Sequence, residues 1–150
     1  MAEPPTVTGF QYREEPVASE VDLANRFGEP VWVPAEWPVG LNPPEFLYMF
    51  PPPGESHGDA HHFRSNYQLR SVTDGQLLVV DGHRRRPGNL ESSLLPLEGE
   101  RFETWTRPAD RSPHIVVRAP VWDVHVLGSV SFDTALSVAR GLVQVAVTDQ

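Results

Sequence analysis

The chain has 150 residues, no cysteine and a formal net charge of −8. This length predicts one domain with a core of its own, and the lack of cysteine excludes disulfides and cysteine-ligated zinc. The negative charge argues against nucleic-acid and anionic-membrane partners, because both need a positive field. No apolar run reaches the roughly 18 residues of a membrane helix, and the start has no signal-peptide pattern, so we expect a cytoplasmic protein.

Residues 1–18 are predicted to form a loosely ordered segment, because they are polar and interrupted by proline. Only Val7, Phe10 and Tyr12 could anchor them, so a short edge strand is the most structure that we expect there. The remaining residues, 19–150, are predicted to form a single α+β domain.

A short helix is predicted after Ser19. Ser19 can cap its first turn and Asp22, three residues later, can complete a capping box. Leu23 and Phe27 lie four positions apart and therefore share one face of the helix. Gly28 is placed where helices commonly end.

Five to seven strands, mostly antiparallel, are predicted to follow this helix. The clearest local signal is Asp74-Gly75, which favours a type I′ hairpin turn because both central positions need a positive φ. Short connections argue against parallel crossovers. The apolar or alternating runs that predict strands are at residues 31–33, 46–50, 63–70, 71–80, 101–106 and 114–127.

A second helix is predicted over residues 131–144, packed on the sheet. Ser131 is its candidate cap and Arg140 lies towards its negative end. Gly141 inside the helix costs about 1 kcal/mol relative to alanine, which suggests a close contact between helix and sheet. The apolar stripe at helical spacing is Ala135, Leu136, Ala139, Leu142 and Val143.

The segment 50–63 contains a G-x-S-x-G string centred on Ser56. In a nucleophile elbow such a serine follows directly on a strand of a parallel sheet. Here three prolines, 51–53, precede the string and deny it a hydrogen-bonded strand. His114 and His125 could supply a base and Asp123 its orienting acid, but nothing in the sequence links them to Ser56. We interpret the segment as a polar loop and predict no catalytic residue.

The same loop carries a candidate metal site. His57 and His61 are four residues apart, so both rings would face one ion on a helical turn, with His62 or Asp59 as a further ligand. The spacing matches neither the zincin motif nor another metallo-hydrolase motif. We therefore expect no resident cofactor, and zinc or another divalent cation at His57, His61 and His62 is the alternative.

Two surface features bear on partners. Trp37 and Pro38 could contact an extended peptide, although the four tryptophans of a small domain more often form its core; Trp37 is predicted to be the most exposed of them. The run Arg84–Arg86 could hold a phosphate or an acidic partner, but its turn-rich flanks favour a solvated loop. Glu98, Glu100 and Glu103 are interpreted as a solvated rim.

Several of these pieces occur in the order found in one bacterial family. "VDLANRFGEPVWVPAEWPVGL" and "VHVLGSVSFDTALSVARGL" resemble the opening and the close of a domain of unknown function found in anti-sigma-factor-like and lipoprotein-like membrane proteins. Trp37 and Leu41 stand where that family usually has Leu and Tyr, and its membrane anchor is missing here. The resemblance implies helices packed on an antiparallel sheet and transfers no catalytic residue.

The sequence therefore predicts a non-catalytic interaction or ligand-sensing module. Its partner would be a protein or a small molecule, with no nucleic acid or membrane involved, and a homodimer is possible. The alternative is a small metal-dependent or serine hydrolase that uses residues 54–62. A change in thermal stability on chelation would favour this alternative.

Overall fold

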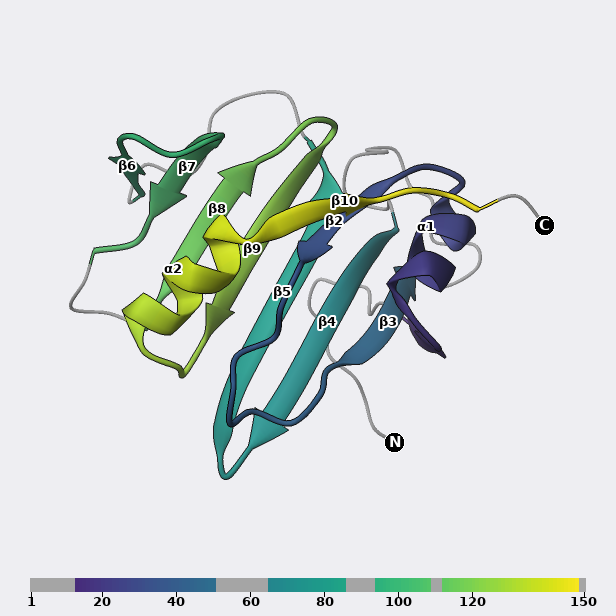
Figure 1. Ribbon diagram of the computed structural model, residues 1–150, viewed down its shortest axis with the longest axis horizontal. Helices are drawn as coiled ribbons and strands as arrows, with labels where there is room; N and C mark the ends of the chain where they lie inside the picture. Colours follow the sequence, from purple (N-terminus) through teal and green to yellow (C-terminus); the bar gives the residue numbers. More distant parts are fainter. Residues whose placement is uncertain (1–12, 51–64, 86–93, 109–111, 149–150) are drawn as a thin grey trace, which may run out of the picture.

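The computed structural model describes residues 13–50, 65–85, 94–108 and 112–148. The elements in chain order (Figure 1) are β1 (Arg13–Val17), α1 (Glu20–Phe27), β2 (Val31–Pro34), β3 (Glu45–Phe50), β4 (Asn66–Thr73), β5 (Gln76–Arg84), β6 (Leu95–Leu97), β7 (Glu103–Thr106), β8 (His114–Arg118), β9 (Trp122–Gly128), α2 (Phe132–Arg140) and β10 (Leu142–Val145). Eight strands form one antiparallel sheet in the order β1-β3-β4-β5-β9-β8-β7-β6. The fold is α+β, as expected.

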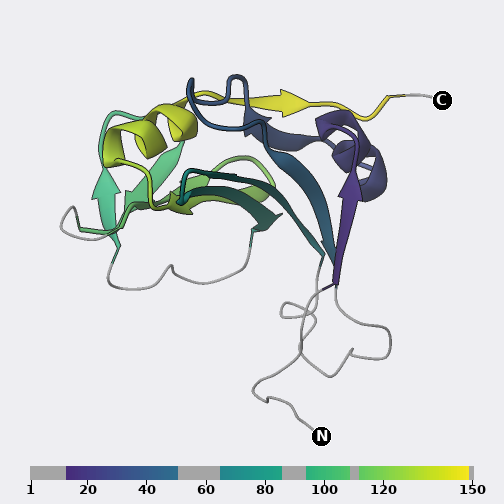
Figure 2. The same cartoon turned by 90° about the horizontal axis from the view of Figure 1, so that it is seen from below.

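A second layer covers one face of this main sheet. It consists of α1, α2 and a two-stranded antiparallel ribbon of β2 and β10, all on the same side (Figure 2). Helix α1 contacts β3, whereas α2 contacts β8 and β9. In the described parts of the chain, no helix is both long enough and apolar enough to cross a membrane.

The Ser19 cap, the end of α1 at Gly28 and the hairpin turn are confirmed, whereas the Asp22 carboxylate accepts a hydrogen bond from the Ala18 amide and does not close the expected capping box on Ser19. The Ser19 hydroxyl accepts a hydrogen bond from the Asp22 amide at 3.2 Å, and Gly28 ends the helix in the left-handed region at φ 73°. The turn between β4 and β5 has positive φ at both Asp74 (48°) and Gly75 (83°), as a type I′ turn requires. The short edge strand expected near the N-terminus is β1.

The prediction that the second helix continues to residue 144 is wrong. Helix α2 ends at Arg140, Gly141 caps it, and Leu142 begins β10. The β-branched residues that follow Gly141 favour a strand, and pairing with β2 satisfies their backbone groups. Leu142 is still part of the core, but it reaches it from the ribbon.

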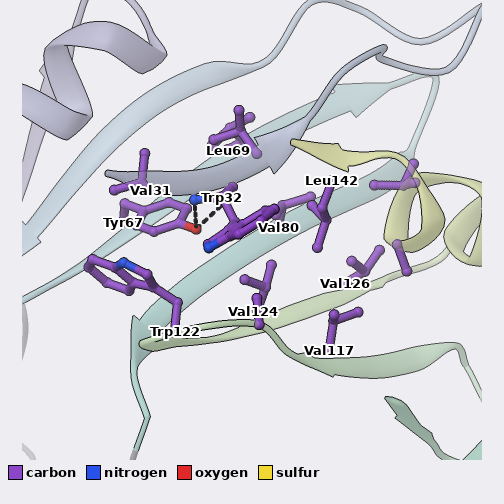
Figure 3. Packing of buried hydrophobic residues seen from close by; sticks show 14 of the residues in the cluster. Val31, Trp32, Tyr67, Leu69, Val80, Val117, Trp122, Val124, Val126 and Leu142 are labelled. Atoms are coloured by element: carbon purple, nitrogen blue, oxygen red, sulfur yellow. Dashed lines mark hydrogen bonds between the residues drawn. The ribbon is translucent and has the colours of Figure 1, made fainter. Parts of the chain in front are cut away.

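The core lies between the main sheet and the covering layer, and Tyr67 links the two (Figure 3). The Tyr67 hydroxyl donates a hydrogen bond to the Trp32 carbonyl and accepts one from the Trp32 amide at 3.2 Å. Burial raises the pKa of Tyr67 above its ordinary value, so the hydroxyl keeps its proton. A Cβ atom at Gly82, the cross-strand partner of Tyr67, would overlap the Tyr67 ring, so glycine makes room for it.

Candidate functional site

The face of the main sheet that turns away from the helices is unusually polar in its centre. Successive residues of a strand point to opposite faces, and Tyr67, Val80 and Val124 belong to the core between the layers. Their neighbours therefore point to the other side. We call this side the polar face; its central polar side chains come from β4, β5, β8 and β9 and are Asn66, Gln68, Asp81, His83, His114, Arg118, Asp123 and His125.

Three histidines form a row across this face. The Nε2 atoms of His83 on β5 and His125 on β9 are 2.9 Å apart, and His125 Nδ1 lies 2.8 Å from His114 Nε2 on β8. The ring centroids are 4.9 Å and 5.1 Å apart. The residues sit at diagonal positions of neighbouring strands, which long side chains can bridge.

The two ends of the row give it a direction. The Arg107 guanidinium, 3.3 Å from His114 Nδ1, can only donate, so that nitrogen accepts. At the other end the Arg84 carbonyl, 2.9 Å from His83 Nδ1, can only accept, so that nitrogen carries a proton. The consistent assignment is then His114 Nε2–H to His125 Nδ1, and His125 Nε2–H to His83 Nε2. All three rings are neutral in this assignment, and each donates once and accepts once.

This row does not have the geometry of a metal centre. His125 uses a different nitrogen for each neighbour, so the three rings are arranged in a line and do not converge on one point. Two nitrogens on a tetrahedral zinc are about 3.3 Å apart, longer than either contact. Within the described residues, no group of three or more His, Cys, Asp or Glu side chains is arranged to hold a metal ion.

Beside the row lies an amide–carboxylate cluster. Asp81 Oδ1 accepts hydrogen bonds from Asn66 Nδ2 at 2.6 Å and from Gln68 Nε2 at 3.0 Å. The donation by Asn66 Nδ2 fixes the orientation of this amide, so its Oδ1 is the atom left buried without a partner. An unsatisfied buried acceptor is costly. Asn66 Oδ1 is enclosed by its neighbours, so a ligand with an N–H or O–H group reaches it only if these side chains move apart.

A buried ion pair lies beside the histidine row, near the first residues of β9. The carboxylate of Asp123, 1% exposed, is held by Arg118 through contacts of 3.1 Å and 3.3 Å. The hydrogen bond with Asp123 raises the pKa of Arg118. Arg85 approaches the same carboxylate at 3.7 Å and donates to the carbonyls of Arg118 and Ala119. These contacts fix the connection between β8 and β9.

The residues proposed from the sequence have different outcomes. Ser56, His57, His61 and His62, with the rest of the 54–62 loop, lie outside the described residues, so both the metal site and the serine hydrolase remain predictions. The structure does bring His114, His125 and Asp123 onto one face. What sequence reasoning missed is their connection to His83, which depends on the register of three strands.

The aromatic and basic surface features also find places. Trp32 and Trp122 belong to the buried core, and Trp37 is half-buried against it, beside a half-buried Pro38. The interpretation of the arginine run as a solvated loop is wrong for Arg84, which ends β5 and pairs with Glu29. Arg85 is exposed and follows the strand, as expected for a solvated loop, although it makes the contacts described above. Arg86 lies outside the described residues.

No protein-family model, no curated protein and no solved structure matches this chain. The family resemblance stated above therefore stays a prediction, and the function has to be argued from the geometry of the molecule itself.

Proposed function

We propose that this chain is a non-catalytic ligand-sensing or interaction module that binds its ligand on the polar face of the main sheet. The observation that carries the proposal is the histidine row. Its hydrogen bonds all run in one direction between Arg107 and the Arg84 carbonyl. A proton or a ligand that takes over one ring nitrogen leaves two donors or two acceptors facing each other, so the change is passed on across β5, β9 and β8.

The surroundings of the row favour a ligand with hydrogen-bond donors. Asp81 is the cross-strand neighbour of His125, and Asp123 is that of His83. Asn66, opposite His83 on β4, contributes the unpartnered acceptor. Of the cations beside the row, Arg118 and Arg85 contact Asp123, and Arg107 donates to His114 and to the Ser112 carbonyl. The acceptors of Asp81 and Asn66 are therefore the groups that favour a ligand with donors.

The row can be tested by recording the imidazole nitrogens by ¹⁵N NMR between pH 8 and pH 5, the range in which histidine titrates. At pH 8 we expect His83 as the Nδ1–H form, and His114 and His125 as Nε2–H forms. In His125→Phe, which keeps a ring but removes both nitrogens, His83 and His114 each lose an imidazole partner, so the nitrogen signals of both should shift from their wild-type positions. Unchanged nitrogen signals of these two residues in the variant would rule out the coupling.

The sensing role needs a second measurement. Native mass spectrometry of gently purified protein would detect a small molecule that co-purifies, and size-exclusion chromatography with light scattering would test the homodimer that belongs to the same proposal. A ligand that binds the wild type and His125→Phe equally well would exclude the polar face as its site. A cytoplasmic location is likewise part of the proposal, and localisation of a tagged chain tests it.

A further inference from the structure

A cavity of about 410 Å³ lies on the opposite, helix-covered side, between α1, β3 and the end of β5. Its lining residues are Arg26, Phe27, Tyr48, Ser65 and Arg84. We propose that this cavity binds a small organic anion, a phosphate monoester or a carboxylate, with its oxygens between the guanidinium groups of Arg26 and Arg84. This inference goes beyond the proposed function, because it concerns the other face of the sheet.

Aromatic rings hold the two guanidinium groups in place. The Arg26 guanidinium lies 4.3 Å from the centroid of the Tyr48 ring, and that of Arg84 lies 5.2 Å from the centroid of the Trp122 ring. Phe27 stands between these rings, 5.0 Å from Tyr48 and 5.1 Å from Trp122, in edge-to-face contacts. Stacked arginines have already lost much of their conformational freedom, so less entropy is lost when they bind an anion.

Among the residues that the structure describes, each arginine pairs with one carboxylate through a single nitrogen. Arg26 meets Glu15 through its NH2 group at 2.5 Å, and Arg84 meets Glu29 through the same group. A guanidinium has five N–H donors in a planar fork, so the Nε and NH1 groups lie outside these ion pairs. The carboxylates neutralise the local charge, and we therefore expect moderate affinity that rests on directed hydrogen bonds.

Two hydroxyl groups add to the donors. Tyr48 Oη and Ser65 Oγ are 3.1 Å apart and share one hydrogen bond. That bond uses one of the two hydroxyl protons, and the second proton can be donated to an oxygen of the ligand. The donors of the cavity thus come from α1, β3, β5 and the residue before β4.

The size of the cavity indicates an anion with an organic body. Ligand sites commonly measure about 300–1,000 Å³, and 410 Å³ is far more than one phosphate group fills. The rings of Phe27 and Tyr48 offer apolar surface against which an aromatic or aliphatic body can pack. Phenyl phosphate and benzoate combine both features and serve as probes.

The test is a titration of the ¹⁵N-labelled protein with phenyl phosphate, benzoate, inorganic phosphate and benzyl alcohol, followed by NMR. We expect phenyl phosphate to bind most tightly, with shifts at Phe27, Ser65 and the Trp122 side chain, and benzoate to show whether a carboxylate suffices. Arg84→Gln and Arg26→Gln should each weaken phenyl phosphate binding at least tenfold. Arg140→Gln is the matched control, because Arg140 is also ion-paired, with Glu100, but lies on α2.

Three results would overturn the proposal. One is equal binding of benzyl alcohol and phenyl phosphate, which would make the cavity merely apolar. Another is an unchanged affinity in both arginine variants, and the third is no binding of any anion near millimolar concentration. If an arginine variant fails to fold, Ser65→Ala provides the milder perturbation. His125→Phe should bind phenyl phosphate normally, so failure here is distinguishable from failure of the polar-face proposal.

Discussion

Removal of one oxygen atom, by Tyr67→Phe, tests the link between the two layers. The Tyr67 hydroxyl is the partner of both the amide and the carbonyl of Trp32. β10 pairs with the opposite edge of β2 and cannot replace it. Tyr67 is 0% exposed and Trp32 is 9% exposed, so no water is at hand to take over.

The expected cost follows from these contacts. The variant leaves two buried backbone groups unsatisfied, and each such group costs about 1–3 kcal/mol. Phenylalanine recovers part of this, because the hydroxyl no longer has to be buried. We expect a net loss of about 3 kcal/mol in the free energy of unfolding. At about 2–4 °C per kcal/mol for a chain of this size, the melting temperature should fall by about 6–12 °C.

The measurement is urea unfolding followed by tryptophan fluorescence, with Tyr48→Phe as the matched control. The Tyr48 hydroxyl makes one half-buried hydrogen bond, to Ser65, so its removal should cost about 1 kcal/mol or less. A loss in Tyr67→Phe no larger than that in Tyr48→Phe would refute the reasoning, because it would mean that the Trp32 backbone groups find other partners.

Two further predictions concern the connection between β8 and β9 and the outer face of α2. Val121 follows Pro120 and has φ 71°, a strained value for a β-branched residue. Val121→Gly should therefore stabilise the protein by about 1 kcal/mol. Thermal melts measure this gain, and the control Val121→Ile, which keeps the β-branch, should show none. The Arg140 guanidinium lowers the pKa of Glu100, so this pair stabilises the fold above the ordinary carboxyl pKa and the contribution disappears as the pH falls through the lowered value. Arg140→Gln should therefore raise the pKa of Glu100 in a ¹³C NMR titration, and its stability should differ from that of the wild type at pH 7 but not at pH 2; an unchanged Glu100 titration would contradict the assignment.

The features that the sequence predicts best are those that depend on a few neighbouring residues, such as helix ends and turns. Ser19 and Gly28 bound α1, and Asp74-Gly75 forms its turn, because capping and positive φ are local requirements. The predicted end of the second helix is wrong because the apolar stripe at helical spacing continues past Gly141, and only the partner strand β2 shows that Leu142 leaves the helix. Here the pairing of two strands that are distant in the sequence overrides the local helical pattern.

The histidine row could not be predicted from the sequence for a related reason. His83, His114 and His125 lie in three strands, and a shift of one residue in any register would turn a ring to the other face. Their alternation with core valines was visible, for example in Val124, His125 and Val126, and could have placed each ring on the face away from the core. The order of the strands, which puts β9 between β5 and β8, could not be read from the chain.

The β2–β10 ribbon has a consequence for synthesis on the ribosome. Val31 and Trp32 emerge first, and their partners, Val145 and Gln144, follow more than 110 residues later in the sequence. At about 5–20 residues per second, translation takes roughly 6 to 23 s to bring the second strand out. For that time an apolar β-strand lacks its partner strand, so its unpaired edge is open to association with other chains, and faster translation shortens this exposure.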